Sequence, residues 1–217
     1  GAGYIGSILS PMLINKGHNV TIIDNFMYQQ NSINQLCSFK NFDVVNGDVR
    51  QMSSMKPLIK KADIVIPLAA YVGAPLCSKD PINAKLVNKN AIVDMLETLS
   101  NDQIVLMPTT NSAYGSGDEN NECTEESTLK PISQYAIDKV EVEKALCNHK
   151  NFISFRLATV FGMSPRMRLD LLVNDFTYRA VYDKFVVLYE AHFKRNYIHV
   201  IDVANAFIHS IDHYDKM

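Results

Sequence analysis

The chain has 217 residues, of which 47% are apolar, and its 21 basic and 23 acidic side chains give a formal net charge of −2. Because basic residues are not in excess, the composition argues against nucleic-acid binding. No apolar stretch is long enough to cross a bilayer. The four cysteines lack C-x-x-C spacing, which favours reduced thiols in a cytoplasmic protein over a zinc site or disulfides. The length suits one sizeable core and part of a second domain.

The first expected element is a glycine loop that leads directly into a helix. Gly1, Gly3 and Gly6 form a G-x-G-x-x-G pattern, and the helical periodicity over 4–16 is closed by Gly17. Glycines let a backbone approach a pyrophosphate closely, and the helix N-terminus offers N–H groups to the anion. The strand that should precede this loop is absent, so we interpret the sequence as a fragment that begins inside the motif.

Apolar runs and helical patterns then alternate along the chain. Strands are expected over 19–24, 41–46, 62–68, 103–107 and 152–157, and helices over 52–61, 83–99 and 133–149. This alternation predicts a doubly wound α/β fold in which a parallel sheet is covered on both faces. The polar, acidic segment 117–130 predicts an exposed loop at the active site, although a connector without a role fits equally well.

Small and acidic residues follow the expected strands. Asp24 ends an apolar run about twenty residues after the glycine loop, where a carboxylate accepts the adenosine ribose hydroxyls and favours NAD over NADP. Asp48, in N-G-D-V, can meet the adenine edge. Ordinary turn chemistry is the alternative for both residues. Leu68, Ala69 and Ala70 end the next strand in a way that lets a cofactor lie against the backbone.

The candidate catalytic residues lie in the second half of the expected sheet. Tyr135 and Lys139 are four residues apart and share one face of the expected helix. An ammonium beside a tyrosine hydroxyl lowers its pKa and makes proton exchange with a substrate hydroxyl feasible. The spacing alone is a weak signal. Thr110, about twenty-five residues earlier, can hydrogen-bond the same substrate oxygen, and by spacing alone Thr109 and Ser112 are alternatives.

Eight motifs in order carry a family resemblance over 1–204, nearly the whole chain. They are G-A-G-Y-I-G-S, I-I-D-N, G-D-V, P-L-A-A, T-T-N-S-A-Y-G, Q-Y-A-I-D-K, F-R-L-A-T-V-F-G and R-N-Y-I-H-V-I-D-V-A. With them the chain resembles the extended short-chain dehydrogenase/reductases of the NAD-dependent epimerase/dehydratase family, which act on nucleotide sugars. Within that family the motifs are most similar to those of the UDP-galactose 4-epimerases.

The resemblance implies a domain organisation. Residues 1–162 are expected to form an NAD-binding Rossmann domain that lacks its first strand. Residues 163–195 are expected to begin a truncated substrate-binding domain, and 196–217 to return and pack on the Rossmann domain. A homodimer is compatible with the apolar positions Val140, Val142 and Leu146 on the Tyr135 helix, but packing within the chain's own core explains them equally well.

The resemblance also assigns the site residues. Thr110, Tyr135 and Lys139 match the catalytic positions. The cofactor set comprises Gly1, Gly3, Tyr4, Ile5, Gly6, Asp24, Asn25, Asp48, Val49, Leu68, Ala69, Ala70, Tyr135 and Lys139. The substrate set comprises Asn111, Ser112, Asn174 and Arg195. Arg195 matches an arginine that contacts the substrate diphosphate, with a plain surface arginine as the alternative. Outside the site, Asp202 is expected to cap a helix and His199 to be structural.

One departure from the family pattern bears on the reaction. Asn111 and Ser112 stand where sugar 4,6-dehydratases carry an Asp-Glu pair, which argues against a dehydratase. Ser112 also weakens the case for a decarboxylase. We therefore expect an epimerase that oxidises a sugar hydroxyl transiently and returns the hydride. The alternatives are an NAD(P)-linked reductase or dehydrogenase, a decarboxylase of the same family, or a non-catalytic NAD-binding sensor.

Overall fold

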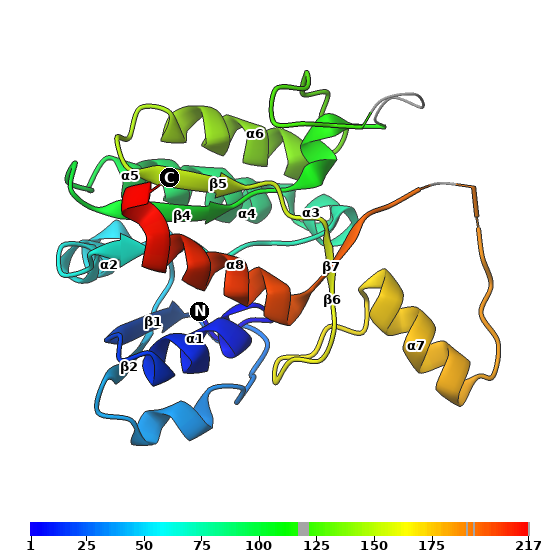
Figure 1. Ribbon diagram of the computed structural model, residues 1–217, viewed down its shortest axis with the longest axis horizontal. Helices are drawn as coiled ribbons and strands as arrows, with labels where there is room; N and C mark the ends of the chain where they lie inside the picture. Colours follow the sequence, from blue (N-terminus) through cyan, green and yellow to red (C-terminus); the bar gives the residue numbers. More distant parts are fainter. Residues whose placement is uncertain (117–121, 190, 193, 217) are drawn as a thin grey trace. The chain divides into compact units, whose positions relative to one another are not determined.

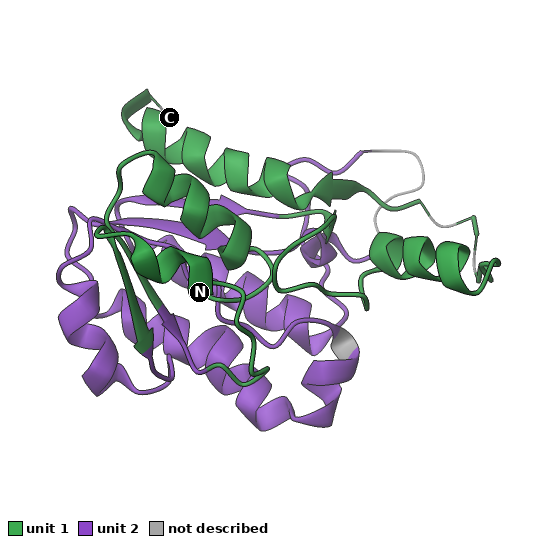
Figure 2. Cartoon of the chain, turned by 90° about the horizontal axis from the view of Figure 1, so that it is seen from below, with its two compact units in different colours: residues 1–22, 26–45, 157–217 green, residues 23–25, 46–156 purple. Residues whose placement is uncertain are grey.

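The structure, a computed structural model, describes residues 1–116, 122–189, 191–192 and 194–216. The chain divides into two compact units (Figure 2). Unit 1 consists of Gly1–Ile22, Phe26–Val45 and Leu157–Met217, and unit 2 consists of Ile23–Asn25 and Asn46–Arg156. In the described part of the chain, no helix has both the length and the apolar character of a membrane span.

Unit 2 contains a three-stranded parallel sheet in the order β3-β4-β5 (Figure 1). Its strands are β3 (Ile64–Val65), β4 (Ile104–Pro108) and β5 (Phe152–Phe155). Its helical elements are α2 (Met52–Ile59), α3 (Ala74–Lys79), α4 (Pro81–Lys85), the π-turn η2 (Leu86–Asn90), α5 (Ala91–Leu96), the 3₁₀ turn η3 (Asn111–Tyr114) and α6 (Gln134–Leu146). The central strand β4 pairs through Val105 with Val65 on one side and Phe152 on the other.

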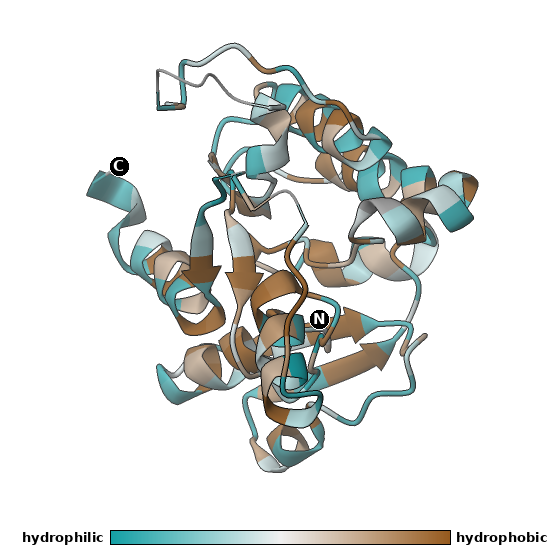
Figure 3. Ribbon diagram, turned by 90° about the vertical axis from the view of Figure 1, so that its right-hand side faces the viewer, coloured by the Kyte–Doolittle hydropathy of each residue, from teal (hydrophilic) through white to brown (hydrophobic). Residues whose placement is uncertain are grey.

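The core of unit 2 lies between the sheet and three helices. From β4, Val105 and Met107 meet side chains of α2, α5 and α6; the buried members are Met55, Ile59, Ile92, Met95, Val105, Met107, Val142 and Leu146. Leu106, also fully buried, points to the opposite face, because side chains alternate along a strand. The strand arrows visible in Figure 3 are coloured as hydrophobic over much of their length. The expected α/β fold is confirmed. Leu146 packs in this core and is not part of an exposed apolar face.

Unit 1 contains the N-terminal helix and the C-terminal third of the chain. Its elements are α1 (Gly6–Asn15), η1 (Asn34–Ser38), β6 (Thr159–Phe161), α7 (Leu172–Tyr182), β7 (Tyr197–His199), α8 (Val200–His213) and η4 (Tyr214–Lys216). Strands β1 (Val20–Asp24) and β2 (Phe42–Asn46) pair with each other and end in unit 2. Strands β6 and β7 form a separate parallel pair. Helices α1 and α8 pack together, and Lys16, the C-cap residue of α1, forms an ion pair with Asp212 of α8 at 2.8 Å.

Several local expectations are confirmed and others are wrong. Gly17 ends α1 at φ +89°, and the next N–H, of His18, donates to the Leu13 carbonyl as in a Schellman cap. The helix expected over 83–99 is interrupted by the η2 π-turn. The strand expected over 62–68 is reduced to the two residues of β3, and the pairing of β6 with β7 was not expected.

The expected cap of the last long helix is also corrected. Asp202 lies in the first turn of α8, and the cap residue is His199, whose Nδ1 accepts a hydrogen bond from the Ile201 N–H at 3.3 Å. His199 was expected to be structural, and this contact gives it such a role. Of the acidic segment expected to form a loop, residues 117–121 lie outside the described residues, and Glu122, Cys123 and Thr124 are exposed.

Candidate active site

The glycine loop of unit 1 has the geometry that a dinucleotide-binding loop requires. A Cβ at Gly6 would overlap the carbonyl oxygen of Gly1, and a Cβ at Gly1 would overlap the side chain of Ile22 in β1. Beside Gly3, in contrast, a Cβ would meet nothing within 4 Å. Gly1 and Gly6 thus permit tight packing of loop, helix and strand, while open space at Gly3 allows a ligand to approach the backbone. Ile5 occupies the N-cap position of α1.

Tyr4 of this loop is tied to the C-terminal part of unit 1. Its hydroxyl donates to the Gly162 carbonyl at 2.5 Å and accepts from the Asn174 amide at 3.2 Å. The Asn174 side chain also accepts from the Gly162 N–H at 2.9 Å and donates to the Arg168 carbonyl at 3.0 Å. Burial raises the pKa of Tyr4, so its hydroxyl stays protonated. The side chain of Asn174 is therefore occupied within the chain, and its contact with substrate stays a prediction.

In unit 2 the carboxyl ends of β1 and β2 bring three predicted cofactor residues together. The Gly47 N–H donates to the Asp24 carbonyl at 3.0 Å, and Asn25 hydrogen-bonds the side chain of Asp48. Arg50 also donates to Asp48, through Nε at 2.8 Å and Nη2 at 2.5 Å. These hydrogen bonds lower the pKa of Asp48 to about 2. The carboxyl ends of parallel strands are where such folds bind ligands.

The segment that follows β3 is held in place by a buried asparagine that the sequence analysis missed. Leu68, Ala69 and Ala70 are half-buried and lead to Tyr71, whose N–H and carbonyl both bond the side chain of Asn88 at 2.8 and 2.9 Å. Asn88 is fully buried in the η2 π-turn. A polar residue on the buried face of a helical pattern was the available sequence signal. Another cofactor prediction, Val49, packs against the unit 2 core.

Thr110 lies directly after β4 and caps the η3 turn. Only 8% of the surface of Thr110 is exposed. Its hydroxyl accepts a hydrogen bond from the Ser112 N–H at 3.2 Å. Because that bond uses an oxygen lone pair, the hydroxyl hydrogen is left for another acceptor. Asn111 is half-buried in the turn and Ser112 is exposed. The η3 turn packs against α6, the helix that carries the other two catalytic candidates.

Tyr135 and Lys139 occupy the first two turns of α6. Ser133 caps this helix by accepting from the Ala136 N–H at 3.2 Å, which fixes where the first turn begins. The Lys139 Nζ lies 6.0 Å from the centroid of the Tyr135 ring. The predicted one-face arrangement of Tyr135 and Lys139 therefore exists in the structure.

Lys139 is a buried cation, with 2% of its surface exposed. Burial lowers its pKa from 10.5 to about 8, while the charge of the neighbouring Asp138 and the influence of Cys77 act in the opposite direction. Asp138 is itself buried and accepts a hydrogen bond from Gln134 at 2.9 Å. At neutral pH the ammonium form is retained, so a positive charge lies in the part of α6 that carries Tyr135.

Arg195, the last predicted substrate residue, lies on the exposed segment just before β7 in unit 1. The predicted site residues are thus divided between the units. The glycine loop, Asn174 and Arg195 belong to unit 1. The candidate catalytic residues Thr110, Tyr135 and Lys139 belong to unit 2, as do the cofactor candidates Asp24 and Asp48. A hollow of about 490 Å³ lined by Lys60 and Asp102 lies where β3 and β4 begin, the end opposite to that at which such sheets bind ligands.

Parallel α/β topology, a tight glycine loop before a helix and a Tyr-Lys pair define a nucleotide-binding protein of the Rossmann type. The whole chain, residues 1–217, matches the model of the NAD dependent epimerase/dehydratase family. The chain therefore belongs to this family, which confirms the predicted family and the dependence on NAD.

The individual relatives catalyse different reactions. The chain is 30% identical over 152 residues to a UDP-N-acetyl-alpha-D-glucosaminuronate decarboxylase from Bacillus cytotoxicus, which covers 68% of this chain and 47% of the relative. A UDP-glucuronic acid decarboxylase 1 from Xenopus tropicalis is 24% identical over 96% of this chain and 51% of its own length. The chain thus spans about half the length of the curated relatives it matches.

Solved structures confirm the fold. The UDP-N-acetylglucosamine 4-epimerase from Methanobrevibacter ruminantium, in complex with UDP-N-acetylmuramic acid, superposes with a TM-score of 0.84 at 24% identity, over 95% of this chain and 69% of that one. The UDP-glucuronic acid 4-epimerase from Bacillus cereus, in complex with UDP-glucuronic acid and NAD, gives 0.82 at 22% identity, over 97% and 70%.

Proposed function

We propose that this chain is the NAD-binding part of a nucleotide-sugar epimerase that oxidises a sugar hydroxyl transiently and returns the hydride to the opposite face. The observation that carries the proposal is the catalytic set of unit 2. Tyr135 and the buried Lys139 share one face of α6, and the turn capped by Thr110 packs against that helix. The two side chains that follow Thr110 are an amide and a hydroxyl, so they supply no carboxyl group for eliminating water.

The glycine loop fits the cofactor that the family uses. The open space at Gly3 and the start of α1 suit a pyrophosphate. Asp24, at the end of β1, suits the ribose hydroxyls of NAD. Bound NAD supplies a reversible hydride acceptor, and an epimerase needs no net change in its oxidation state.

The chain's own residues then handle the proton. The Thr110 hydroxyl already accepts a hydrogen bond from the Ser112 N–H. Its own hydrogen is therefore available, and Thr110 donates it to the reacting sugar oxygen. Tyr135 accepts the proton of the sugar hydroxyl as the hydride leaves and gives it back when the hydride returns. The Lys139 ammonium favours the phenolate form of Tyr135 by charge.

A decarboxylase is the second candidate, and one observation favours it. The relative that is 30% identical over 152 residues is a decarboxylase of a nucleotide-linked uronic acid. The same oxidation of a uronic acid makes the neighbouring carboxylate a leaving group. The carboxylate leaves as CO₂, a proton from solvent replaces it, and the hydride returns to the ketone. The same three residues of unit 2 serve both reactions, so the residues after Thr110 and the products must discriminate between them.

Proton NMR of the full-length protein in D₂O tests both candidates. The probes are UDP-glucose, UDP-N-acetylglucosamine and UDP-glucuronic acid, each offered separately to the protein with NAD. An epimer without deuterium at the inverted carbon supports internal hydride return. Release of CO₂ with solvent deuterium at the carbon that lost it supports the decarboxylase. If NAD binds but no probe is converted, both candidates are wrong for UDP-sugars.

Tyr135→Phe is the matched control for this experiment. It removes only the proton-carrying hydroxyl, so we expect turnover to fall by about 10²- to 10⁴-fold while NAD still binds. Retention of most of the activity would show that Tyr135 does not carry the proton. NAD binding, followed by equilibrium dialysis, shows whether the folded cofactor site survives the substitution.

A further inference from the structure

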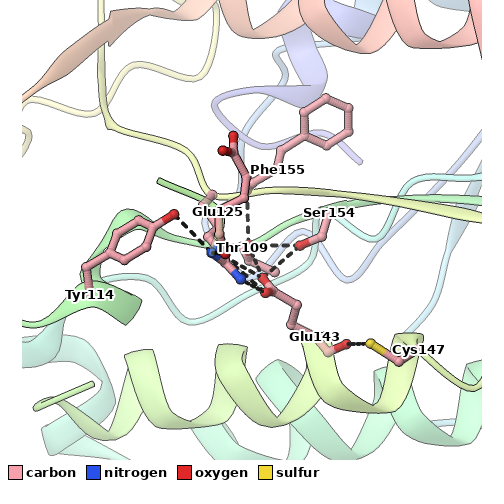
Figure 4. Close-up of polar contacts among 8 residues, drawn as sticks. Thr109, Tyr114, Glu125, Glu143, Cys147, Ser154 and Phe155 are labelled. Atoms are coloured by element: carbon pink, nitrogen blue, oxygen red, sulfur yellow. Dashed lines mark hydrogen bonds and ion pairs between the residues drawn. The ribbon is translucent and has the colours of Figure 1, made fainter. Parts of the chain in front are cut away.

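Next to the η3 turn of unit 2 lies a partly buried ion pair that the sequence analysis did not identify (Figure 4). Arg156, which follows β5, donates through Nε to both carboxylate oxygens of Glu143 on α6, at 3.0 and 3.2 Å. Its Nη2 also bonds Glu143 Oε1. Only 18% and 15% of the two side chains are exposed. A fork of this kind fixes both the distance and the relative orientation of its partners.

Glu143 extends the contact to the end of β4. Its Oε2 accepts from the Ser154 hydroxyl at 2.9 Å and from the Thr109 hydroxyl at 3.2 Å. Thr109 is the residue immediately before Thr110. Burial alone would raise the pKa of Glu143, but the hydrogen bonds from Arg156, Ser154 and Thr109 outweigh it and lower that pKa. Glu143 is therefore a carboxylate at neutral pH and accepts from all three groups.

Arg156 also bonds the C-terminal end of the η3 turn. Its Nη1 donates to the Tyr114 hydroxyl at 3.0 Å and to the Glu125 carbonyl at 2.9 Å. Tyr114 is the last residue of η3, and the Arg156 guanidinium carbon lies 5.2 Å from the centroid of its ring. In Figure 4, Tyr114 and Glu143 lie on opposite sides of this cluster of hydrogen bonds. The pair thus bonds residues on both sides of Thr110.

The same pair is anchored on the helix of the other two catalytic candidates. Glu143 lies four residues after Lys139, which lies four residues after Tyr135, so the three side chains are on one face of α6. A displacement of the turn along α6 would change the spacing between the Thr110 hydroxyl and the Tyr135 hydroxyl. Both must reach one substrate oxygen in the proposed reaction, and misplacement by about 1 Å can lower a rate by about 10²-fold.

We infer that Arg156 and Glu143 are positioning residues, which hold the Thr110 turn at a fixed place along the Tyr135–Lys139 helix. The inference rests on the proposed function for the roles of those three residues. It assigns to the pair no contact with substrate or cofactor. A polar pair that served stability alone would be replaceable by apolar side chains of similar volume, and this is the difference that the test uses.

The test compares Arg156→Lys, which keeps the charge but loses the fork, with the double variant Arg156→Met/Glu143→Leu, which replaces the pair by apolar groups. We expect kcat to fall about 10- to 100-fold in both, with KM changed less than about 3-fold. The double variant should recover the melting temperature without recovering kcat. Recovery of both would show that the pair is only structural. The control is Glu141→Gln on α6, which breaks the ion pair of Glu141 with Lys89 of η2 and should leave kcat unchanged.

A second readout does not depend on any reaction. Amide hydrogen exchange of Ser112, whose N–H bonds Thr110, should be at least about 10-fold faster in Arg156→Lys if the turn loses its anchor. The Leu106 amide, inside β4, should exchange as in the wild type. Unchanged exchange at Ser112 would overturn the inference. If the wild type converts no UDP-sugar but Ser112 exchanges faster in the variant, the proposed function is wrong for UDP-sugars and the anchoring of the turn stands.

Discussion

The two units stabilise their buried polar groups in different ways. In unit 2 the two side chains next to the η3 turn, Arg156 and Glu143, carry full charges. In unit 1 the groups behind the glycine loop are neutral: the Tyr4 hydroxyl, the Asn174 amide and the backbone of Gly162. Each set joins a loop to an element distant in the sequence, so both have the same structural task.

The difference determines how each set fails. A buried charge whose partner is removed has no good substitute, because desolvation of an ion is much more costly than that of an amide or hydroxyl. A neutral group that loses its partner costs less, and a water molecule can replace it. We therefore expect large, pH-dependent losses in unit 2 and small, pH-independent losses in unit 1.

The largest expected effect is that of Arg156→Met, which leaves the Glu143 carboxylate buried without its cation. The free energy of unfolding should fall by about 3–5 kcal/mol at pH 7. In the wild type the pKa of Glu143 is lowered in the folded state, so its contribution is present above its unfolded pKa and is lost as the pH falls through the folded pKa. The deficit of the variant should therefore shrink only as the pH falls below 4.5, the ordinary pKa of a glutamate, as measured by urea unfolding. A deficit independent of pH would contradict the ionic account.

Lys139→Met should act in the opposite direction on stability. The folded pKa of Lys139 is about 8 instead of 10.5, so keeping it charged costs about 3 kcal/mol. Because the unfolded chain binds the proton more tightly, this cost is fully present below pH 8 and is relieved as the pH rises to 10.5. Without NAD, the variant should melt at a higher temperature than the wild type at pH 7 and lose that advantage above pH 10, although its turnover is lost. A lower melting temperature at pH 7 would contradict the prediction.

Asn174→Leu tests the neutral hydrogen bonds of unit 1. The substitution removes the acceptor of the Gly162 N–H and the donor to Tyr4 at similar side-chain volume. We expect a loss of about 1–3 kcal/mol, since one buried N–H is left without its partner. Chemical unfolding at pH 5 and pH 8 should give the same loss. A loss as large as that of Arg156→Met would remove the distinction between the two networks.

The smallest expected effect is that of Tyr4→Phe. It removes one hydroxyl that donates to the Gly162 carbonyl, while Asn174 still bonds the Gly162 N–H. We expect a loss of about 1 kcal/mol, and NAD affinity measured by calorimetry should change little, because the glycine backbone is intact. A strong loss of NAD binding would instead show that the Tyr4 hydroxyl shapes the loop.

Much of the fold could be predicted because its signals are local. Gly17 marks the end of α1 through its own φ, and Ser133 marks the start of α6 through its own side chain. The pairing of β6 with β7 could not be predicted in this way, since its partners are 35 or more residues apart. The break in the helix expected over 83–99 contains Asn88, whose hydrogen-bond partner Tyr71 lies 17 residues earlier.

The candidate site shows the same division. The Tyr135–Lys139 face follows from helical spacing alone. The buried state of Lys139 and its lowered pKa follow from residues packed around it and could not be predicted from spacing. The Arg156–Glu143 pair did leave a trace in the sequence, an arginine directly after the apolar run of β5. Without the fold, nothing identified Glu143 as its partner.

Gly162 carries a consequence for how this sequence can evolve. Its φ is +113°, its N–H and carbonyl are both bonded, and a Cβ there would overlap the ring of His199, the residue that caps α8. Any side chain at Gly162 therefore disturbs folding, whether or not a ligand is bound. A Cβ at Gly3 would meet nothing within 4 Å. A side chain there is compatible with folding and interferes only with cofactor binding. Side chains at these two glycines of the same unit are thus excluded for different reasons, and the reason at Gly3 no longer applies once the need for the nucleotide disappears.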